Sequence, residues 1–139
     1  MLIKKTIRLI DKEALYDIKA SLSIFIKNDA CVIKVVMNDN QNLEFISSDF
    51  FKTLSLFRDY IYSEKKLFPL CKGALKFIYP SRMSRQMSNG LMAYSLKLGK
   101  QADDKYLINI FDDIEESEID NLSIVEDQLN WFKKWLKSL

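Results

Sequence analysis

The chain contains no histidine among its 139 residues. This absence excludes histidine-based catalytic triads, histidine metal sites and acid–base catalysis by an imidazole. The sequence also lacks GxGxxG, P-loop and nucleophile-elbow patterns. An enzyme with this composition would have to rely on carboxylates, lysine, tyrosine or cysteine. We therefore expect a protein that binds a partner, without catalysis and without a cofactor.

Cysteine, glycine and proline are also scarce. The two cysteines, Cys31 and Cys71, lie far apart and show no metal-binding spacing. A secreted disulfide scaffold would need more of them, so we expect two reduced thiols with at least one in the core. Three glycines and two prolines leave little room for long linkers. The length then favours a single domain over residues 1–139.

Long apolar runs are missing as well. No stretch approaches the ~18 apolar residues of a membrane span. Residues 1–7 have neither a long apolar run nor a small-residue cleavage site, unlike a signal peptide. With 48% apolar and 29% charged residues and a net charge of +2, the chain resembles an ordinary soluble domain. We expect a cytoplasmic protein that makes no membrane contact.

The first third of the sequence indicates β-strands. Residues 2–10, 18–27, 31–37 and 43–46 are strand-like in composition, and Leu22, Ile24 and Ile26 alternate with more polar neighbours. Polar turn sequences separate these segments. Short strands joined by tight turns predict antiparallel pairing.

A helix is predicted over residues 49–64. Its apolar positions are spaced by four, three and four, which places them on one helical face: Phe50, Leu54, Phe57 and Ile61. Ser48 precedes them as a candidate N-cap, and Asp49 would lie in the first turn.

A second helix is predicted at the C-terminus. Its apolar stripe is Leu122, Val125, Leu129, Phe132, Leu136 and Leu139, and Ser123 and Glu126 have the spacing of a capping box. Trp131 and Trp135 flank the stripe. They would either widen the buried face or serve as exposed anchors for a partner.

The middle of the chain is less regular. We expect strands over 75–79, 92–98 and 105–111, whereas residues 80–90 fit either a helical turn or an excursion between strands. The order is strands, helix, strands, helix. It predicts an α+β fold with one or two antiparallel sheets and two amphipathic helices.

Charge is unevenly distributed along the chain. Residues 65–105 hold nine cations and two anions, and residues 106–127 hold eight anions and no cation. The acidic run is either a solvated connection or a recognition surface for a basic partner. Its candidate partner-binding residues are Asp112, Asp113, Glu115, Glu116, Glu118 and Asp120. The run lacks the glycine and the spacing of a calcium loop, so we expect no metal there.

The basic segment 65–105 suggests an alternative function. Lysines and arginines interspersed with Phe68, Phe77, Tyr79 and Tyr94 are typical of proteins that bind single-stranded nucleic acid. However, the last three aromatics occupy strand-like positions that suit a core. The overall pI of 8.4 is also below the value of about 9 expected of a dedicated binding domain. Nucleic acid is therefore the less favoured partner.

One stretch carries a family resemblance. It comprises residues 79–83 (Tyr-Pro-Ser-Arg-Met), 87–94 (Met-Ser-Asn-Gly-Leu-Met-Ala-Tyr), 99–100 (Gly-Lys) and 107–112 (Leu-Ile-Asn-Ile-Phe-Asp). The stretch is similar to the small immunity proteins of bacterial contact-dependent growth inhibition and related polymorphic toxin systems. The resemblance implies a cytosolic protein that binds one cognate toxin domain, commonly a nuclease, and blocks its active site. Such proteins have no catalytic residues, which agrees with the missing histidine.

The order of strands and helices also resembles the whirly fold, whose plant members bind single-stranded DNA. That resemblance concerns architecture alone, and a fold does not determine a function.

Overall fold

The computed structural model describes residues 1–13 and 17–139. Its N-terminal part is the predicted antiparallel sheet, with strands β1 (Leu2–Ile10), β2 (Asp17–Lys27), β3 (Ala30–Met37) and β4 (Asn42–Ser47). The short β5 (Phe68–Pro69) joins the other edge of β1, which gives the order β4-β3-β2-β1-β5. Asn28 and Asp29 form the β2–β3 turn with positive φ angles of 52° and 63°, a conformation that both residue types tolerate.

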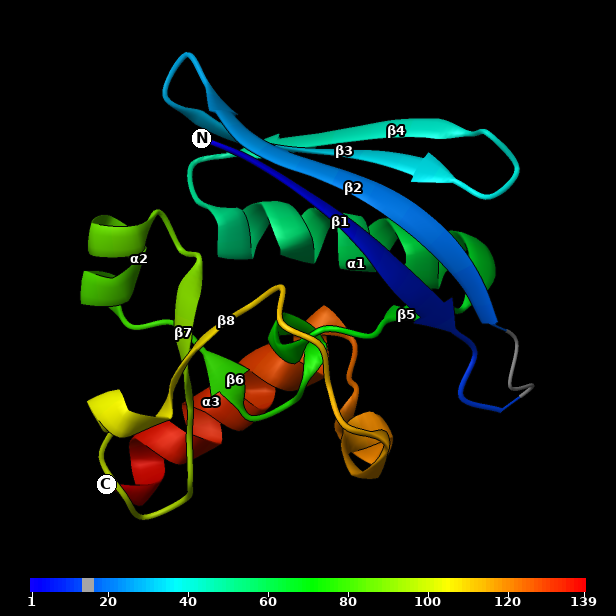
Figure 1. Cartoon of the computed structure of the whole chain (residues 1–139). Coiled ribbons are helices and arrows are strands. Elements are labelled where there is room, and N and C mark those ends of the chain that lie inside the picture. The colour runs from blue at the N-terminus through cyan, green and yellow to red at the C-terminus, as the bar shows by residue number, and fades with distance from the viewer. Residues whose placement is uncertain (14–16) are drawn as a thin grey trace.

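The predicted first helix is present as α1 (Phe50–Lys65), and its four apolar positions are at most 1% exposed. Its N-cap differs from the prediction. Asp49, rather than Ser48, occupies the cap, and its Oδ1 accepts a hydrogen bond from the backbone N–H of Lys52 at 2.8 Å. Asp49 has the extended backbone that a cap requires, and its carboxylate reaches the third amide of the helix. α1 lies between the large sheet and the second half of the chain (Figure 1).

The second half forms a smaller antiparallel sheet of β6 (Ile78–Tyr79), β7 (Met92–Ser95) and β8 (Leu107–Asn109). Its helices are α2 (Arg82–Ser88), α3 (Val125–Ser138) and the 3₁₀ turns η1 (Lys72–Ala74), η2 (Asp104–Tyr106) and η3 (Glu116–Asn121). The α+β class with antiparallel sheets is thus confirmed. Of the two interpretations left open for residues 80–90, the helical one is correct.

These strands are shorter than the sequence predicts. Leu75 makes only an isolated bridge with Leu122 after the η1 turn. The strand predicted from residue 105 begins at Leu107, because the Asp103 carboxylate accepts a hydrogen bond from the N–H of Lys105 at 3.1 Å and starts a 3₁₀ turn. Local side-chain-to-backbone bonds therefore compete with strand pairing here.

The predicted stripe of the C-terminal helix is partly wrong. Leu136 and Leu139 are 50% and 56% exposed, whereas Gln128 and Trp135 are 1% and 7% exposed. The predicted Ser123–Glu126 capping box is also wrong, because the N-cap is Ile124 and makes no side-chain cap bond. Trp135 belongs to the core side of α3, and its Nε1 donates to the carbonyl of Lys100 at 2.9 Å. Trp131 is half-buried.

Within the described part of the chain, no helix combines the length and apolar character needed to cross a membrane.

Candidate functional site

The predicted acidic residues lie on the connection from β8 to α3, which contains η3. We call residues 112–120 the acidic segment. Five of its six carboxylate residues are exposed, and Glu118 is half-buried. Figure 1 shows the segment on the opposite side of the second sheet from α2. The structure therefore places the carboxylates together on the surface, on a connection that is neither strand nor α-helix.

Three lysines from distant parts of the chain fix the acidic segment. Lys5 of β1 contacts the carbonyl of Phe111 and forms a 3.2 Å salt bridge with Asp113. Lys72 of η1 binds the Glu118 carboxylate at 2.8 Å. The segment is thus tied down near its start and near its end.

The third lysine, Lys12, follows β1. Its ammonium contacts the carbonyl of Leu122 and lies 3.4 Å from the carbonyl of Asp120. Burial lowers the pKa of Lys12, and the nearby Asp120 opposes that effect. Because backbone carbonyls are held as well as carboxylates, the course of the chain itself is fixed here.

Glu118 belongs to this anchoring set. Partial burial alone would raise the pKa of its carboxyl group. Hydrogen bonds from the backbone N–H of Glu115 and from Lys72 outweigh burial, and the pKa lies below its ordinary value. The Glu118 carboxylate therefore helps to fix the fold of the segment.

The other carboxylates are available to solvent. Asp112, Glu115, Glu116 and Asp120 form no salt bridge with any residue that the structure describes. Asp112 is held only through its backbone, whose carbonyl accepts from the N–H of Lys72 at 2.9 Å. These four exposed residues therefore lie on a backbone that contacts from within the molecule hold in place.

The described residues do not suggest a metal site or a reactive thiol. Among them, no group of three or more Cys, Asp or Glu side chains could hold a metal ion. Cys31 and Cys71 are both free and buried. Burial raises the pKa of both thiols, that of Cys71 to about 11. Because the thiolate is the reactive species, neither group is suited to nucleophilic catalysis.

The structure reveals a buried polar cluster that the sequence analysis missed. Arg58 of α1 is 3% exposed and donates to the carbonyls of Gly73 and Ser123 and to the side chain of Gln128. Burial lowers the pKa of its guanidinium to about 10. Because all three acceptors are neutral and backbone groups dominate, we interpret this cluster as a clamp between α1 and the second half of the chain.

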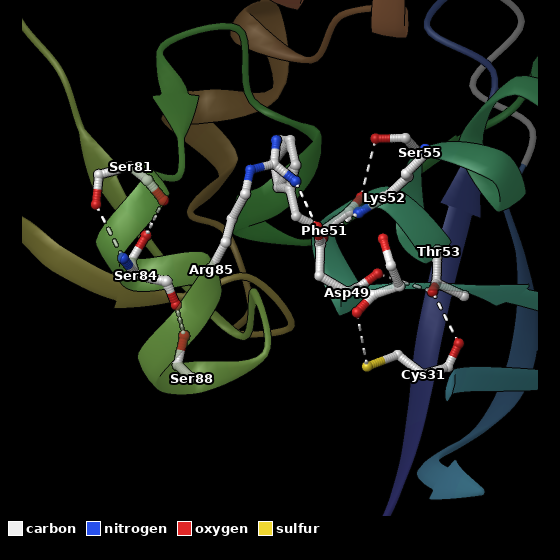
Figure 2. Close-up of polar contacts among 11 residues, drawn as sticks. Cys31, Asp49, Phe51, Lys52, Thr53, Ser55, Ser81, Ser84, Arg85 and Ser88 are labelled. Carbon is white, nitrogen blue, oxygen red and sulfur yellow. Dashed lines mark hydrogen bonds and ion pairs between the residues drawn. The ribbon is translucent and has the colours of Figure 1, made fainter. Parts of the chain in front are cut away.

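A cleft of about 520 Å³ lies between α1, β6 and α3, with Arg85 of α2 at its rim. Figure 2 shows Arg85 reaching towards the start of α1, where its Nη1 lies 2.7 Å from an Asp49 carboxylate oxygen. The guanidinium also lies 5.3 Å from the ring centroid of Phe51 and 5.7 Å from that of Tyr79. Arg85 thus fastens α2 to the body of the protein.

The predicted basic segment 65–105 does not form one surface. Lys65 pairs with Asp39, Lys72 with Glu118 and Arg85 with Asp49. Its aromatics are also engaged: Tyr79 stacks on Phe132 with centroids 4.0 Å apart, and Phe77 packs against the core. Only the lysines near its end, at 97, 100 and 105, gather around one cleft.

No protein family model matches this chain, and a search of curated protein sequences found no significant match.

Proposed function

We propose that this protein is an immunity protein, which binds a basic toxin domain through the acidic segment and blocks the active site of the toxin. The observation that carries the proposal concerns four exposed carboxylates, which form no salt bridge with any described residue and lie on a backbone that lysines hold in place: Asp112, Glu115, Glu116 and Asp120. The resemblance of residues 79–112 to immunity proteins supports it. The proposed site of action is the cytoplasm.

Electrostatics supply the mechanism of recognition. Clustered anions accelerate the encounter with a basic partner and set the register of the complex. A toxin nuclease carries a basic surface because it must bind phosphates, so the acidic segment would compete for that surface. A fixed backbone lowers the entropy lost on binding. Inhibition then needs no chemistry from this chain, only occlusion of the toxin's active site.

The test uses the toxin domain that this proposal expects to be encoded immediately upstream of the gene for this protein. Binding is measured at low and high salt for the wild-type chain and for Asp112→Asn/Glu115→Gln/Glu116→Gln. We expect the triple variant to bind at least tenfold more weakly at low salt, with a smaller salt dependence. Survival of cells that produce the toxin domain gives the second readout.

The matched control also removes three exposed carboxylates, with Asp29→Asn, Glu64→Gln and Glu126→Gln. It changes the net charge equally and should leave binding and protection near wild type. Equal binding by the acidic-segment variant and the wild type would refute the proposed surface. Turnover of a substrate by the purified chain would refute occlusion as the whole function.

A further inference from the structure

The loop that joins β7 to β8 encloses a second cleft, of about 270 Å³. We call it the lysine cleft, because it is lined by Lys97, Lys100 and Lys105 together with Gln101, Asp103 and Tyr106. It shares no residue with the acidic segment. Its lining combines several cations with an aromatic ring and an amide, a set of groups that suits an anionic ligand with a flat ring.

Two of the lysines converge on Tyr106. The ammonium of Lys97 lies 5.2 Å from the centroid of the ring and that of Lys105 lies 5.1 Å from it. The two charges are thus within about one Debye length of each other, ~10 Å at 0.1 M salt, and repel one another. The carboxylate of Asp103 lies 3.9 Å from Lys105 and compensates only part of this charge. An anion placed between the lysines would relieve the rest.

The loop is held in place by the C-terminal helix. Trp135 donates its indole N–H to the carbonyl of Lys100, and the hydroxyl of Ser138 accepts the N–H of Gly99 at 2.8 Å. The cleft is therefore built on a loop whose backbone is hydrogen-bonded to α3, and all three lysines belong to this loop. Lys134 is exposed and lies one turn before Ser138 on α3, so it adds a cation to the helical face that docks the loop.

We propose that the lysine cleft binds a nucleotide, whose phosphate draws the ammoniums of Lys97 and Lys105 off the Tyr106 ring and whose base stacks on the ring in their place. Lysine ammoniums suit phosphates, and an aromatic ring stacks on any base. The cleft is close in size to the smallest ligand pockets, which start near 300 Å³, so it suits one nucleotide rather than a larger cofactor. The additional cation at Lys134 favours a nucleotide within a single strand over a free one.

The experiment measures binding of a fluorescent twelve-residue oligo(dT), and in parallel of thymidine monophosphate and inorganic phosphate, at about 50 mM salt. We expect Lys97→Gln/Lys100→Gln/Lys105→Gln to weaken oligonucleotide binding at least tenfold. Three lost phosphate contacts should also make the slope of log K against log salt shallower by about 2. The control variant Lys4→Gln/Lys27→Gln/Lys133→Gln removes as much charge from exposed positions outside the cleft and should bind like the wild type.

A second pair of variants tests the ring. Tyr106→Ala should weaken binding several-fold, and Tyr106→Phe, which keeps the ring, should not. Tighter binding of the oligonucleotide than of the monophosphate supports a site for single strands. If the oligonucleotide and the monophosphate bind equally tightly, the cleft binds a free nucleotide through the same phosphate and ring contacts. Thermal unfolding verifies that each variant is folded.

Three results would overturn the proposal. The first is no oligonucleotide or monophosphate binding at 50 mM salt. The second is that the cleft variant and the control weaken oligonucleotide binding equally, which would show that binding depends on the net charge of the protein and not on the cleft. The third is self-association of the protein that the cleft variant abolishes while nucleotide binding is unchanged. The lysines would then bind the acidic segment of a second copy of the protein instead of a nucleotide. None of these results bears on toxin binding by the acidic segment.

Discussion

The side-chain oxygen of Gln128 lies 2.7 Å from a guanidinium nitrogen of Arg58, and both side chains are buried. The amide nitrogen of Gln128 donates at the same time to the carbonyls of Gly73, Leu75 and Ile78. One glutamine thus connects α3 to α1 and to the backbone that leads into the second sheet. The two halves of the fold are joined by a polar contact as well as by apolar packing.

We expect this contact to contribute substantially to stability. Arg58→Met leaves the Ser123 carbonyl and the Gln128 oxygen without this donor, and Gln128→Leu removes the donor to three carbonyls. Each buried group left unsatisfied costs about 1–3 kcal/mol, so each variant should lose about 2–4 kcal/mol of unfolding free energy. Urea denaturation measures the change.

The double variant separates the pair from its surroundings. Because the two side chains share a hydrogen bond, the loss in Arg58→Met/Gln128→Leu should be smaller than the sum of the single losses. Arg82→Met, at an exposed position of α2, is the control and should change stability little. A loss below about 0.5 kcal/mol in both single variants would contradict the clamp.

Local periodicity explains which parts of the fold could be predicted. The N-terminal strands and α1 bury one face each, so their apolar residues recur with the period of the element. The face of α3 could not be found in this way, because Gln128 is buried to satisfy backbone carbonyls that only the folded chain brings together. The lengths of the strands in the second sheet were overestimated. Side chains such as Asp103 form turns there, although the apolar pattern of the sequence favours a strand.

The candidate site was partly visible in the sequence. The acidic run is contiguous, so its charge could be read directly. Its anchors could not, because Lys72 lies 46 positions from Glu118, and Lys12 lies 110 positions from Leu122. The sequence therefore predicted an acidic surface and missed the contacts that divide it into fixed and outward-facing carboxylates.

Two glycines with the same backbone conformation should respond differently to alanine. Gly90 and Gly99 have φ angles of 77° and 78°, which are unfavourable for any side chain. A Cβ at Gly90 would also lie 2.8 Å from the Asp49 carboxylate, whereas at Gly99 it would meet nothing within 4 Å. Gly99→Ala should cost about 1 kcal/mol and Gly90→Ala about 2–3 kcal/mol. Thermal or urea unfolding of both variants gives the comparison, and equal losses would contradict it.

The cysteines should be unreactive in the folded protein. Both thiols are buried, and the pKa of Cys71 is raised to about 11, so the thiolate is scarce at pH 8. A disulfide reagent such as dithionitrobenzoate should therefore label neither thiol within minutes at pH 8, and both immediately in denaturant. Cys31→Ser assigns any residual reactivity to one position. Rapid labelling of the folded chain would show that the core opens far more often than its packing suggests.

Stability should fall on acidification, and Glu118 should account for part of the fall. Its folded pKa lies below the unfolded value of 4.5, so its contribution is complete above pH 4.5 and is lost as the pH falls through the folded pKa. The unfolding free energy of the wild type should therefore decrease from pH 5 to pH 3. Glu118→Gln should show a shallower decrease, because an amide keeps an acceptor oxygen for Lys72 and Glu115 but does not titrate. Glu64→Gln, at an exposed position outside the segment, should follow the wild-type curve. If Glu118→Gln also follows the wild-type curve, the lysine contact does not stabilise the charged form of this carboxylate.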